Sequence, residues 1–217
     1  MKGQEMFSRS VTLSLVLVGA GANTARAQTV AWHEVHLRYG IRLEVPHDWT
    51  ADRPVVASAI QAGQQRIDAT ALVADDEGHL ITLTGPAFDS NEVNLSIHIM
   101  PTGIGQTALA QMSDADIRAG DENVFRPEAE RVAKRHGLRI TSWHGTSRRT
   151  IGGRYGLLTS YRFTYPNGRE VIKETYSVYL GSRSVNVHVF RRANADRRIV
   201  SALNRMLQSL VIAVDSL

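Results

Sequence analysis

Residues 138–191 alternate apolar and polar side chains, and this period of two restricts the possible folds more than any other feature of the chain. Three turn signals interrupt the alternation, namely Gly152-Gly153, Pro166-Asn167-Gly168 and Gly181-Ser182. Short alternating runs are typical of half-buried strands, and Asn-Gly between two such runs is a strong hairpin signal. We therefore predict an antiparallel meander whose turns join consecutive strands.

The apolar side chains of the meander gather on single strand faces. Aromatic residues arranged in this way pack in a core more often than they line a binding surface. The three expected faces consist of Tyr161, Phe163 and Tyr165, then Ile172, Tyr176, Val178 and Leu180, and finally Val185, Val187 and Val189.

A second alternating segment begins at Ala31 and places apolar residues at odd positions from Val35 to Val45. Tyr39-Gly40 marks a turn that splits it into two short strands. Pro46 ends the second strand, because proline cannot donate to a strand ladder. Further strands are predicted near residues 79–84 and 93–100, whereas residues 51–78 show no regular pattern.

Helical signals separate the N-terminal strands from the meander. Pro127 suits the first turn of a helix over about residues 127–136, and Gly137 stands where a C-terminal cap belongs. Ser113 followed by Asp116 resembles a capping box. A short helix is also expected around Leu109 and Met112.

The last segment, from about Ala195 to Leu210, is predicted to form an amphipathic helix with one apolar stripe. Such a stripe must be buried against another element, and the meander is the obvious partner. We therefore predict a single α+β domain, in which helices pack on the faces of an antiparallel β-sheet as in an α/β/α sandwich.

Residues 1–27 have the three parts of a signal peptide: a basic start, an apolar stretch and small residues at a cleavage site. Lys2 and Arg9 precede an apolar stretch from Val11 to about Ala22. This stretch is shorter than the ~20 residues that span a bilayer, which argues against the alternative of an uncleaved membrane anchor.

We expect cleavage after Ala27, which leaves residues 28–217 as the mature domain. Translation starts at either Met1 or Met6, and a start at Met6 would remove the acidic Glu5 from the basic end of the signal. No later apolar run is long enough to cross a membrane.

The chain contains no cysteine, which excludes disulfides, thiolate metal sites and a cysteine nucleophile. Export without disulfides favours a bacterial periplasm, or secretion from a bacterium, over a small eukaryotic secreted domain. Of the net charge of +4, residues 1–27 hold +2, from three basic residues against one acidic residue. The remaining +2 gives no reason to expect nucleic acid as a partner, and we expect no cofactor.

Several short motifs in the predicted order resemble the PsbP-like superfamily, which includes photosystem II PsbP, a Ran-binding nuclear-transport factor and bacterial envelope proteins of the DcrB type. The resemblance implies an antiparallel sheet with helices on its faces and a binding or assembly role without known catalysis. It assigns no catalytic, metal or cofactor residue. The motifs are Tyr39-Gly40-Ile41, Val45-Pro46-x-x-Trp49, Gly152-Gly153-Arg154-Tyr155, Tyr176-x-x-Tyr179, Val185–Val189 and Ser209-Leu210.

Histidines are the strongest candidates for chemistry. His33 and His36 form an H-x-x-H pair, but residues three apart on a strand point to opposite faces. His36, His98 and His188 each lie on the polar face of a predicted strand. If those strands were neighbours, the three imidazoles could converge on zinc.

Two further possibilities are weaker. A hydrolase would need a nucleophile beside a histidine that a carboxylate orients, and the chain has no G-x-S-x-G motif. Trp32, Trp49 and Trp143 could line an apolar groove, although tryptophans more often pack in a core or at an edge.

The leading hypothesis is therefore an exported, non-catalytic module that recognises another envelope protein and presents an exposed apolar or aromatic patch. The alternative is a protein that binds a metal or a small ligand through convergent histidines. The sequence indicates no catalytic residue and does not set the oligomeric state.

Overall fold

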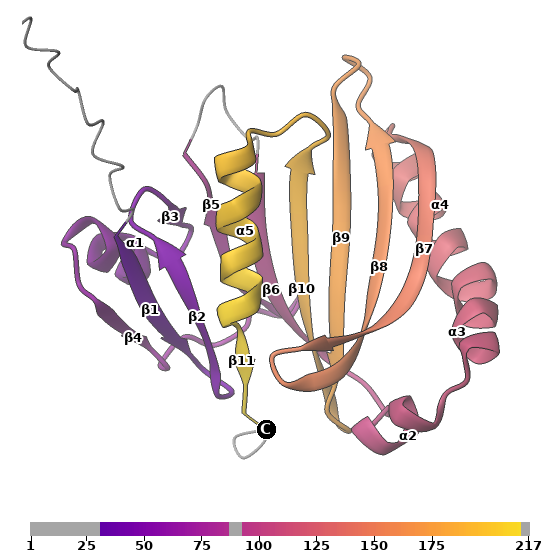
Figure 1. Ribbon diagram of the computed structural model, residues 1–217, viewed down its shortest axis with the longest axis horizontal. Coiled ribbons are helices and arrows are strands. Elements are labelled where there is room, and N and C mark those ends of the chain that lie inside the picture. Colours follow the sequence, from indigo (N-terminus) through magenta and orange to yellow (C-terminus); the bar gives the residue numbers. More distant parts are fainter. Residues whose placement is uncertain (1–30, 87–92, 214–217) are drawn as a thin grey trace, which may run out of the picture.

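The computed structural model describes residues 31–86 and 93–213, so the expected signal peptide, residues 1–27, lies outside the described residues. Strands dominate this part of the chain, and helices occur in three places (Figure 1). The strands are β1 Trp32–Leu37, β2 Ile41–Pro46, β3 Thr50–Ala51, β4 Arg66–Ala69, β5 His79–Thr84, β6 Val93–Pro101, β7 Arg139–Ile151, β8 Arg154–Thr164, β9 Glu170–Tyr179, β10 Arg183–Arg192 and β11 Val211–Ile212. The helices are α1 Pro54–Gln61, α2 Gln106–Gln111, α3 Asp114–Gly120, the π-helical turn η1 Asp121–Phe125, α4 Arg126–Arg135 and α5 Arg197–Ser209.

The described strands form two sheets. The larger sheet has seven strands in the order β3-β5-β6-β10-β9-β8-β7, and its strand pairs are antiparallel. The smaller sheet has the order β11-β2-β1-β4, in which β1 and β4 are parallel. The consecutive pairing of β7, β8, β9 and β10 confirms the predicted meander.

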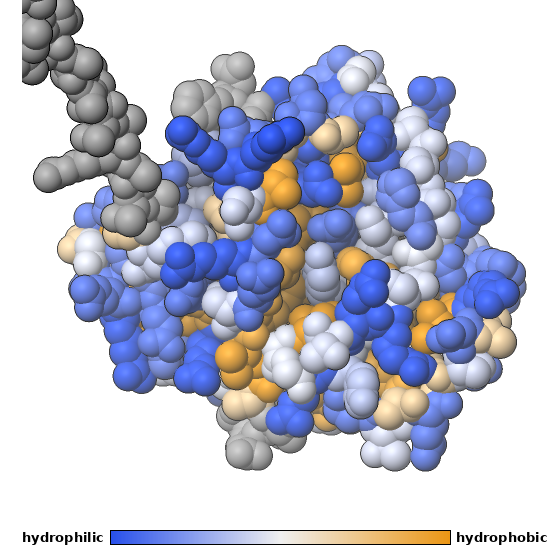
Figure 2. Space-filling view, in the orientation of Figure 1, coloured by the Kyte–Doolittle hydropathy of each residue, from blue (hydrophilic) through white to orange (hydrophobic). Residues whose placement is uncertain are grey.

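Helix α5 and the smaller sheet cover one face of the larger sheet (Figure 1). The apolar stripe of α5 buries Ile199, Leu203 and Met206 in the main core, as predicted. The opposing strand β10 contributes Val185, Val187 and Val189, each at most 1% exposed. Figure 2 shows this side of the molecule, where apolar side chains gather beside α5 within a mostly hydrophilic surface.

The short helices α2, α3 and α4 cover the opposite face of the larger sheet at its β7–β8 end. Val189 and Phe190 are neighbours on β10, but they belong to different apolar clusters because adjacent strand residues point to opposite faces. Phe190 joins the cluster of Tyr161 and Phe163, and Ala129 of α4 packs against it. The predicted aromatic face of β8 is thus core, as expected.

A buried carboxylate ties this helical layer to the sheet. Asp121, at the start of η1, is 9% exposed. Its Oδ2 accepts a hydrogen bond from Trp143 Nε1 at 2.8 Å, and its Oδ1 accepts one from Thr146 Oγ1 at 2.5 Å. A buried acceptor satisfied by two donors on β7 holds the helical layer in one position against this edge of the sheet.

Several local predictions are confirmed in detail. Gly152 and Gly153 form a two-residue turn between β7 and β8, and both have positive φ, as a type I′ turn requires. Ser113 and Asp116 form the predicted capping box. Helix α4 has proline in its first turn and ends one residue before the expected position.

Residues 51–78, for which the sequence pattern predicts no particular element, contain helix α1 and strand β4. Helix α1 has only eight residues, and apolar and β-branched side chains fill much of it, so its sequence shows little helical periodicity. Strand β4 has four residues and is recognised only through its parallel pairing with β1. The single predicted sheet is consequently two sheets.

Within residues 31–86 and 93–213, every helix is too short or too polar to cross a lipid bilayer.

Candidate functional site

Three histidines from neighbouring strands form a row on the face of the larger sheet that carries α2–α4. His79 of β5 stands opposite His98 of β6, and their ring centroids are 5.2 Å apart. His98 in turn lies beside His188 of β10, with ring centroids 5.0 Å apart. The structure therefore confirms the predicted proximity of His98 and His188, and it adds His79.

His36 does not join this row, so the predicted convergence of His36, His98 and His188 is wrong. His36 lies on β1 of the smaller sheet, where its Nε2 is 3.1 Å from Glu34 Oε1. The sequence pattern places His36 on the polar face of its strand, but it does not indicate to which sheet that strand belongs. In the described part of the chain, no group of three or more His, Asp or Glu side chains is arranged to hold a metal ion.

The H-x-x-H pair separates as predicted, because His33 is buried on the inner face of β1 and His36 lies on the other face. His33 Nδ1 is 2.5 Å from the carbonyl oxygen of Gln64, and its Nε2 is 3.3 Å from His47 Nδ1. Since a carbonyl only accepts, Nδ1 of His33 donates; in the neutral imidazole, Nε2 then accepts a hydrogen bond from His47. These contacts give His33 a structural role.

Burial keeps the central imidazoles of the row uncharged. Burial, followed by the charges of Lys173 and His98, lowers the pKa of His188 to about 3. Burial and the neighbouring His79 lower the pKa of His98. The pKa of Lys173, whose Nζ lies 5.1 Å from the centre of the Phe190 ring, is also lowered by burial. His98 and His188 are therefore predominantly neutral at pH 7.

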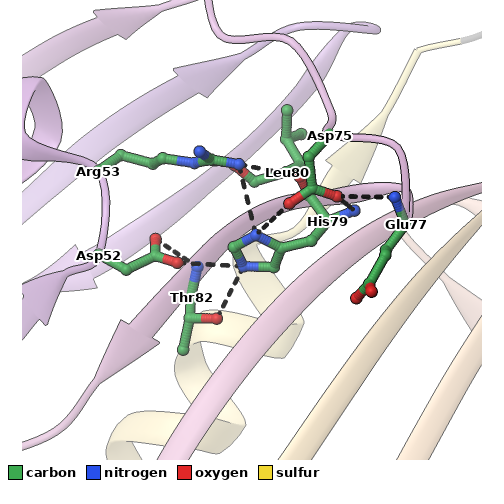
Figure 3. A network of polar contacts seen from close by, with 7 residues as sticks. All are labelled: Asp52, Arg53, Asp75, Glu77, His79, Leu80 and Thr82. Atoms are coloured by element: carbon green, nitrogen blue, oxygen red, sulfur yellow. Dashed lines mark hydrogen bonds and ion pairs between the residues drawn. The ribbon is translucent and has the colours of Figure 1, made fainter.

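His79 lies at the centre of a polar network that joins β3 and α1 to β5 (Figure 3). Its Nε2 is 3.1 Å from Asp52 Oδ2 and 2.9 Å from Thr82 Oγ1. The guanidinium of Arg53 donates to the carbonyl oxygens of His79 and Leu80 at 2.9 and 2.8 Å.

Asp75 completes the network from the short acidic turn before β5. Its Oδ1 accepts hydrogen bonds from the backbone N–H groups of Glu77 and His79 at 3.1 and 2.9 Å (Figure 3). Those hydrogen bonds, together with the charges of His79 and Arg53, lower the pKa of Asp75. The acidic run at residues 75–77 is therefore a solvated turn.

Both ring nitrogens of His79 have more than one polar neighbour. Its Nδ1 lies 3.3 Å from Arg53 Nη2, which can only donate, and 3.5 Å from Asp75 Oδ2, a carboxylate oxygen. The network fastens β5 to the segment between β3 and α1.

A groove of about 540 Å³ lies between helix α4 and the first half of β7. Leu138, Ile140 and Trp143 form its apolar side, where they pack against the cluster of Tyr161 and Phe163. The complete lining is Arg126, Glu130, Ala133, Lys134, Gly137, Leu138, Arg139, Ile140, Thr141, Ser142 and Trp143. Of the three tryptophans, Trp143 lines this groove, whereas Trp49 is buried in the core at 3% exposure.

The rim of the groove is basic, and one side of it is an open sheet edge. Arg126, Lys134 and Arg139 are its cations, and its one carboxylate, Glu130, is 2.9 Å from Arg126 Nε. Strand β7 is the last strand of the larger sheet, so in the described residues it pairs with β8 alone (Figure 1). Part of its backbone is therefore available for pairing with another chain.

Sequence reasoning missed this groove because it treated α4 and β7 as separate elements. The available signal was the three-residue connection, residues 136–138, which places the end of the helix beside the start of the strand.

No family model matches the chain, and no curated protein matches it. Several solved structures are similar to it. The solution structure of cyanobacterial PsbP (CyanoP) from Synechocystis has a TM-score of 0.52 at 10% identity, and the match covers 90% of this chain and 100% of that chain. This match shows that the protein has the PsbP-like fold that the sequence motifs implied.

Two further matches have lower TM-scores. A crystal structure from Bacteroides thetaiotaomicron matches with a TM-score of 0.45 at 10% identity over 85% of this chain, which spans only 50% of that chain. The Saccharomyces cerevisiae Ran-binding protein Mog1p matches with a TM-score of 0.45 at 12% identity, over 86% of this chain and 97% of that chain.

Proposed function

We propose that this protein is an exported, periplasmic binding module without catalytic activity, and that it recognises another envelope protein through the α4–β7 groove. The observation that carries the proposal is the groove itself, in which an apolar side, a basic rim and an open strand edge occur together. The signal-peptide pattern of residues 1–27 and the absence of cysteine support export to a bacterial envelope.

The chemistry of the groove favours an extended, acidic segment of the partner. An extended peptide can add to an open sheet edge through its main chain and place alternate side chains in the adjoining groove. Trp143 and Ile140 would contact its apolar side chains, and Lys134 and Arg139 would attract its carboxylates. Five large apolar side chains of the described residues are also exposed, but they belong to separate elements: Val55, Val73, Met100, Val124 and Tyr155.

Site-specific photo-crosslinking in intact cells tests the proposal. A photoreactive amino acid placed at the position of Ser142, in the groove, is expected to give one discrete adduct with an envelope protein. The same group at the position of Arg198, on the exposed side of α5, serves as the matched control and is expected to give none. Mass spectrometry of the adduct should place the crosslink in an acidic, extended segment.

Charge reversal provides the second arm. Replacing Lys134 and Arg139 together by glutamate should reduce the adduct roughly tenfold, because like charges then face each other across the groove. The Arg198→Glu variant should leave the yield unchanged. Equal adducts at both positions, or an adduct indifferent to the reversal of Lys134 and Arg139, would contradict recognition through the groove.

A further inference from the structure

Lys173 is the one lysine of the larger sheet, and its side chain lies between two aromatic rings. On strand β9 it stands opposite Phe190 of β10 and Tyr161 of β8, on the face of the sheet that carries α2–α4. Its Nζ atom is 5.1 Å from the centre of the Phe190 ring and 5.9 Å from the centre of the Tyr161 ring. Both rings belong to the apolar cluster against which Ala129 of α4 packs. The amine is therefore held at the edge of an apolar cluster.

No counter-ion balances this amine. Among the residues that the structure describes, none places a carboxylate within ion-pair distance of Lys173 Nζ or an acceptor within hydrogen-bond distance of it. Glu174, the next residue of β9, points to the opposite face of the sheet, where it lies 3.9 Å from Arg191. The titratable neighbours of the amine on its own face carry no negative charge at pH 7, and they are Tyr161, His188 and Arg192.

The side chain of Lys173 combines two properties that make a lysine reactive. It is partly exposed, and its Nζ atom reaches solvent. Burial of the rest of the side chain lowers the pKa of the amine. Taking an ammonium out of water without a compensating charge favours the neutral amine, which is the nucleophilic form.

Uncharged hydrogen-bonding groups lie beside the amine. Thr175 follows Lys173 on the same face of β9, and His188 stands opposite Thr175. The Thr175 Oγ1 atom is 3.1 Å from His188 Nδ1. A neutral imidazole and a hydroxyl can each donate and accept a hydrogen bond. These surroundings suit a neutral ligand that carries a carbonyl or hydroxyl oxygen.

We propose that Lys173 is a reversible covalent binding site, at which the side-chain amine forms an imine with an aldehyde-bearing ligand. The nitrogen lone pair attacks the carbonyl carbon, and one amine hydrogen moves to the carbonyl oxygen to give a carbinolamine. The new hydroxyl then leaves with the second amine hydrogen as water, and the C=N bond forms. The step joins one amine to one aldehyde, releases one water, and needs no oxidant or reductant. Lys173 does not line the α4–β7 groove, so this site is additional to the one proposed for an envelope partner.

Reductive trapping with acetaldehyde tests the inference on the purified protein. Cyanoborohydride converts each imine into a stable secondary amine, and peptide mass spectrometry gives the rate at each lysine. The rates are compared at pH 7 between the folded protein and the same protein in concentrated urea. Lys173 should react several-fold faster in the folded protein, because each unit by which a pKa is lowered raises the neutral fraction about tenfold. Lys134, which is exposed on α4, is the internal reference and should react at similar rates in both states.

Thr175→Glu and Thr175→Gln provide a matched pair of variants of nearly equal size. A carboxylate beside the amine favours the ammonium, so Thr175→Glu should remove most of the gain in rate at Lys173. Thr175→Gln adds no charge and should keep the gain. Thermal unfolding of each variant verifies that it is folded.

The inference is overturned if Lys173 reacts no faster in the folded protein than in urea, because the fold would then hide the amine or leave it protonated. It is equally overturned if Lys134 shows the same gain, or if the two variants at position 175 react alike. Either result would show that the surroundings of Lys173 do not set its reactivity.

Discussion

Acidification should destabilise this protein at pH values where its carboxylates are still ionised, and His188 is the reason. The pKa of an unfolded histidine is about 6.5, whereas burial between β9 and β6 lowers the pKa of His188 to about 3 in the folded protein. As the pH falls through 6.5, the unfolded chain binds a proton at this residue and the folded protein does not. Stability is therefore lost as the pH falls, from about 6.5 down to about 3.

The magnitude follows from the width of that window. Each pH unit below 6.5 costs about 1.4 kcal/mol for one such group. Lowering the pH from 8 to 5 should therefore reduce the free energy of unfolding by about 2 kcal/mol through His188 alone. The lowered pKa of His98 acts in the same direction. Asp75 contributes nothing in this range, because its pKa is lowered from 3.8.

Urea denaturation at pH 8 and pH 5 measures the effect. In the His188→Gln variant, the loss of stability between the two pH values should be smaller than in the wild type by about 2 kcal/mol. The glutamine amide can still contact the Thr175 hydroxyl, which lies 3.1 Å from His188 Nδ1. The comparison uses the change with pH, so a uniformly destabilised variant remains informative. His144→Gln, at an exposed position of β7, should keep the full pH dependence. An unchanged pH dependence in His188→Gln would refute the reasoning.

Three further substitutions test the structure, each by urea denaturation at pH 8. Asp121→Asn should destabilise the protein by about 1–3 kcal/mol, because an amide cannot accept at both atoms from the indole and hydroxyl donors of β7. Ser113→Ala should cost about 1 kcal/mol through loss of the capping box, and Ser113→Asp should largely restore it. Gly78→Ala should cost more than about 1 kcal/mol, because Gly78 has a φ of 79° and an added Cβ would lie 2.3 Å from the Ile99 carbonyl oxygen. Wild-type stability in any of these three alanine or asparagine variants would contradict the corresponding contact.

Local patterns predicted most of the elements because their causes lie within a few residues. The Gly152-Gly153 turn follows from glycine's tolerance of positive φ, and the Ser113 cap follows from one side chain and its own helix. Helix α5 was predictable because its apolar stripe repeats with the helical period. Helix α1 was missed because eight residues with little amphipathic contrast carry no such repeat.

The histidine row shows where local patterns stop. His98 and His188 were grouped correctly, but His36 was placed with them although β1 lies in the other sheet. His79 was overlooked, even though a hairpin between β5 and β6 that pairs Thr84 with Asn94 brings it opposite His98. Counting residues back from this hairpin in a regular register does not lead to this pair. The reason is a bulge between His79 and Ile81, which shifts the register by one.

The sequence by itself determined the class of the fold, the meander with its turns, the caps and the apolar faces, because each depends on backbone preferences and on side-chain periodicity along one segment. Only the tertiary structure decided the division into two sheets, the isolation of His36 and the formation of the α4–β7 groove. Those features depend on which segments become neighbours. That choice is made by the packing of the whole core, and the same apolar faces are compatible with more than one order of strands.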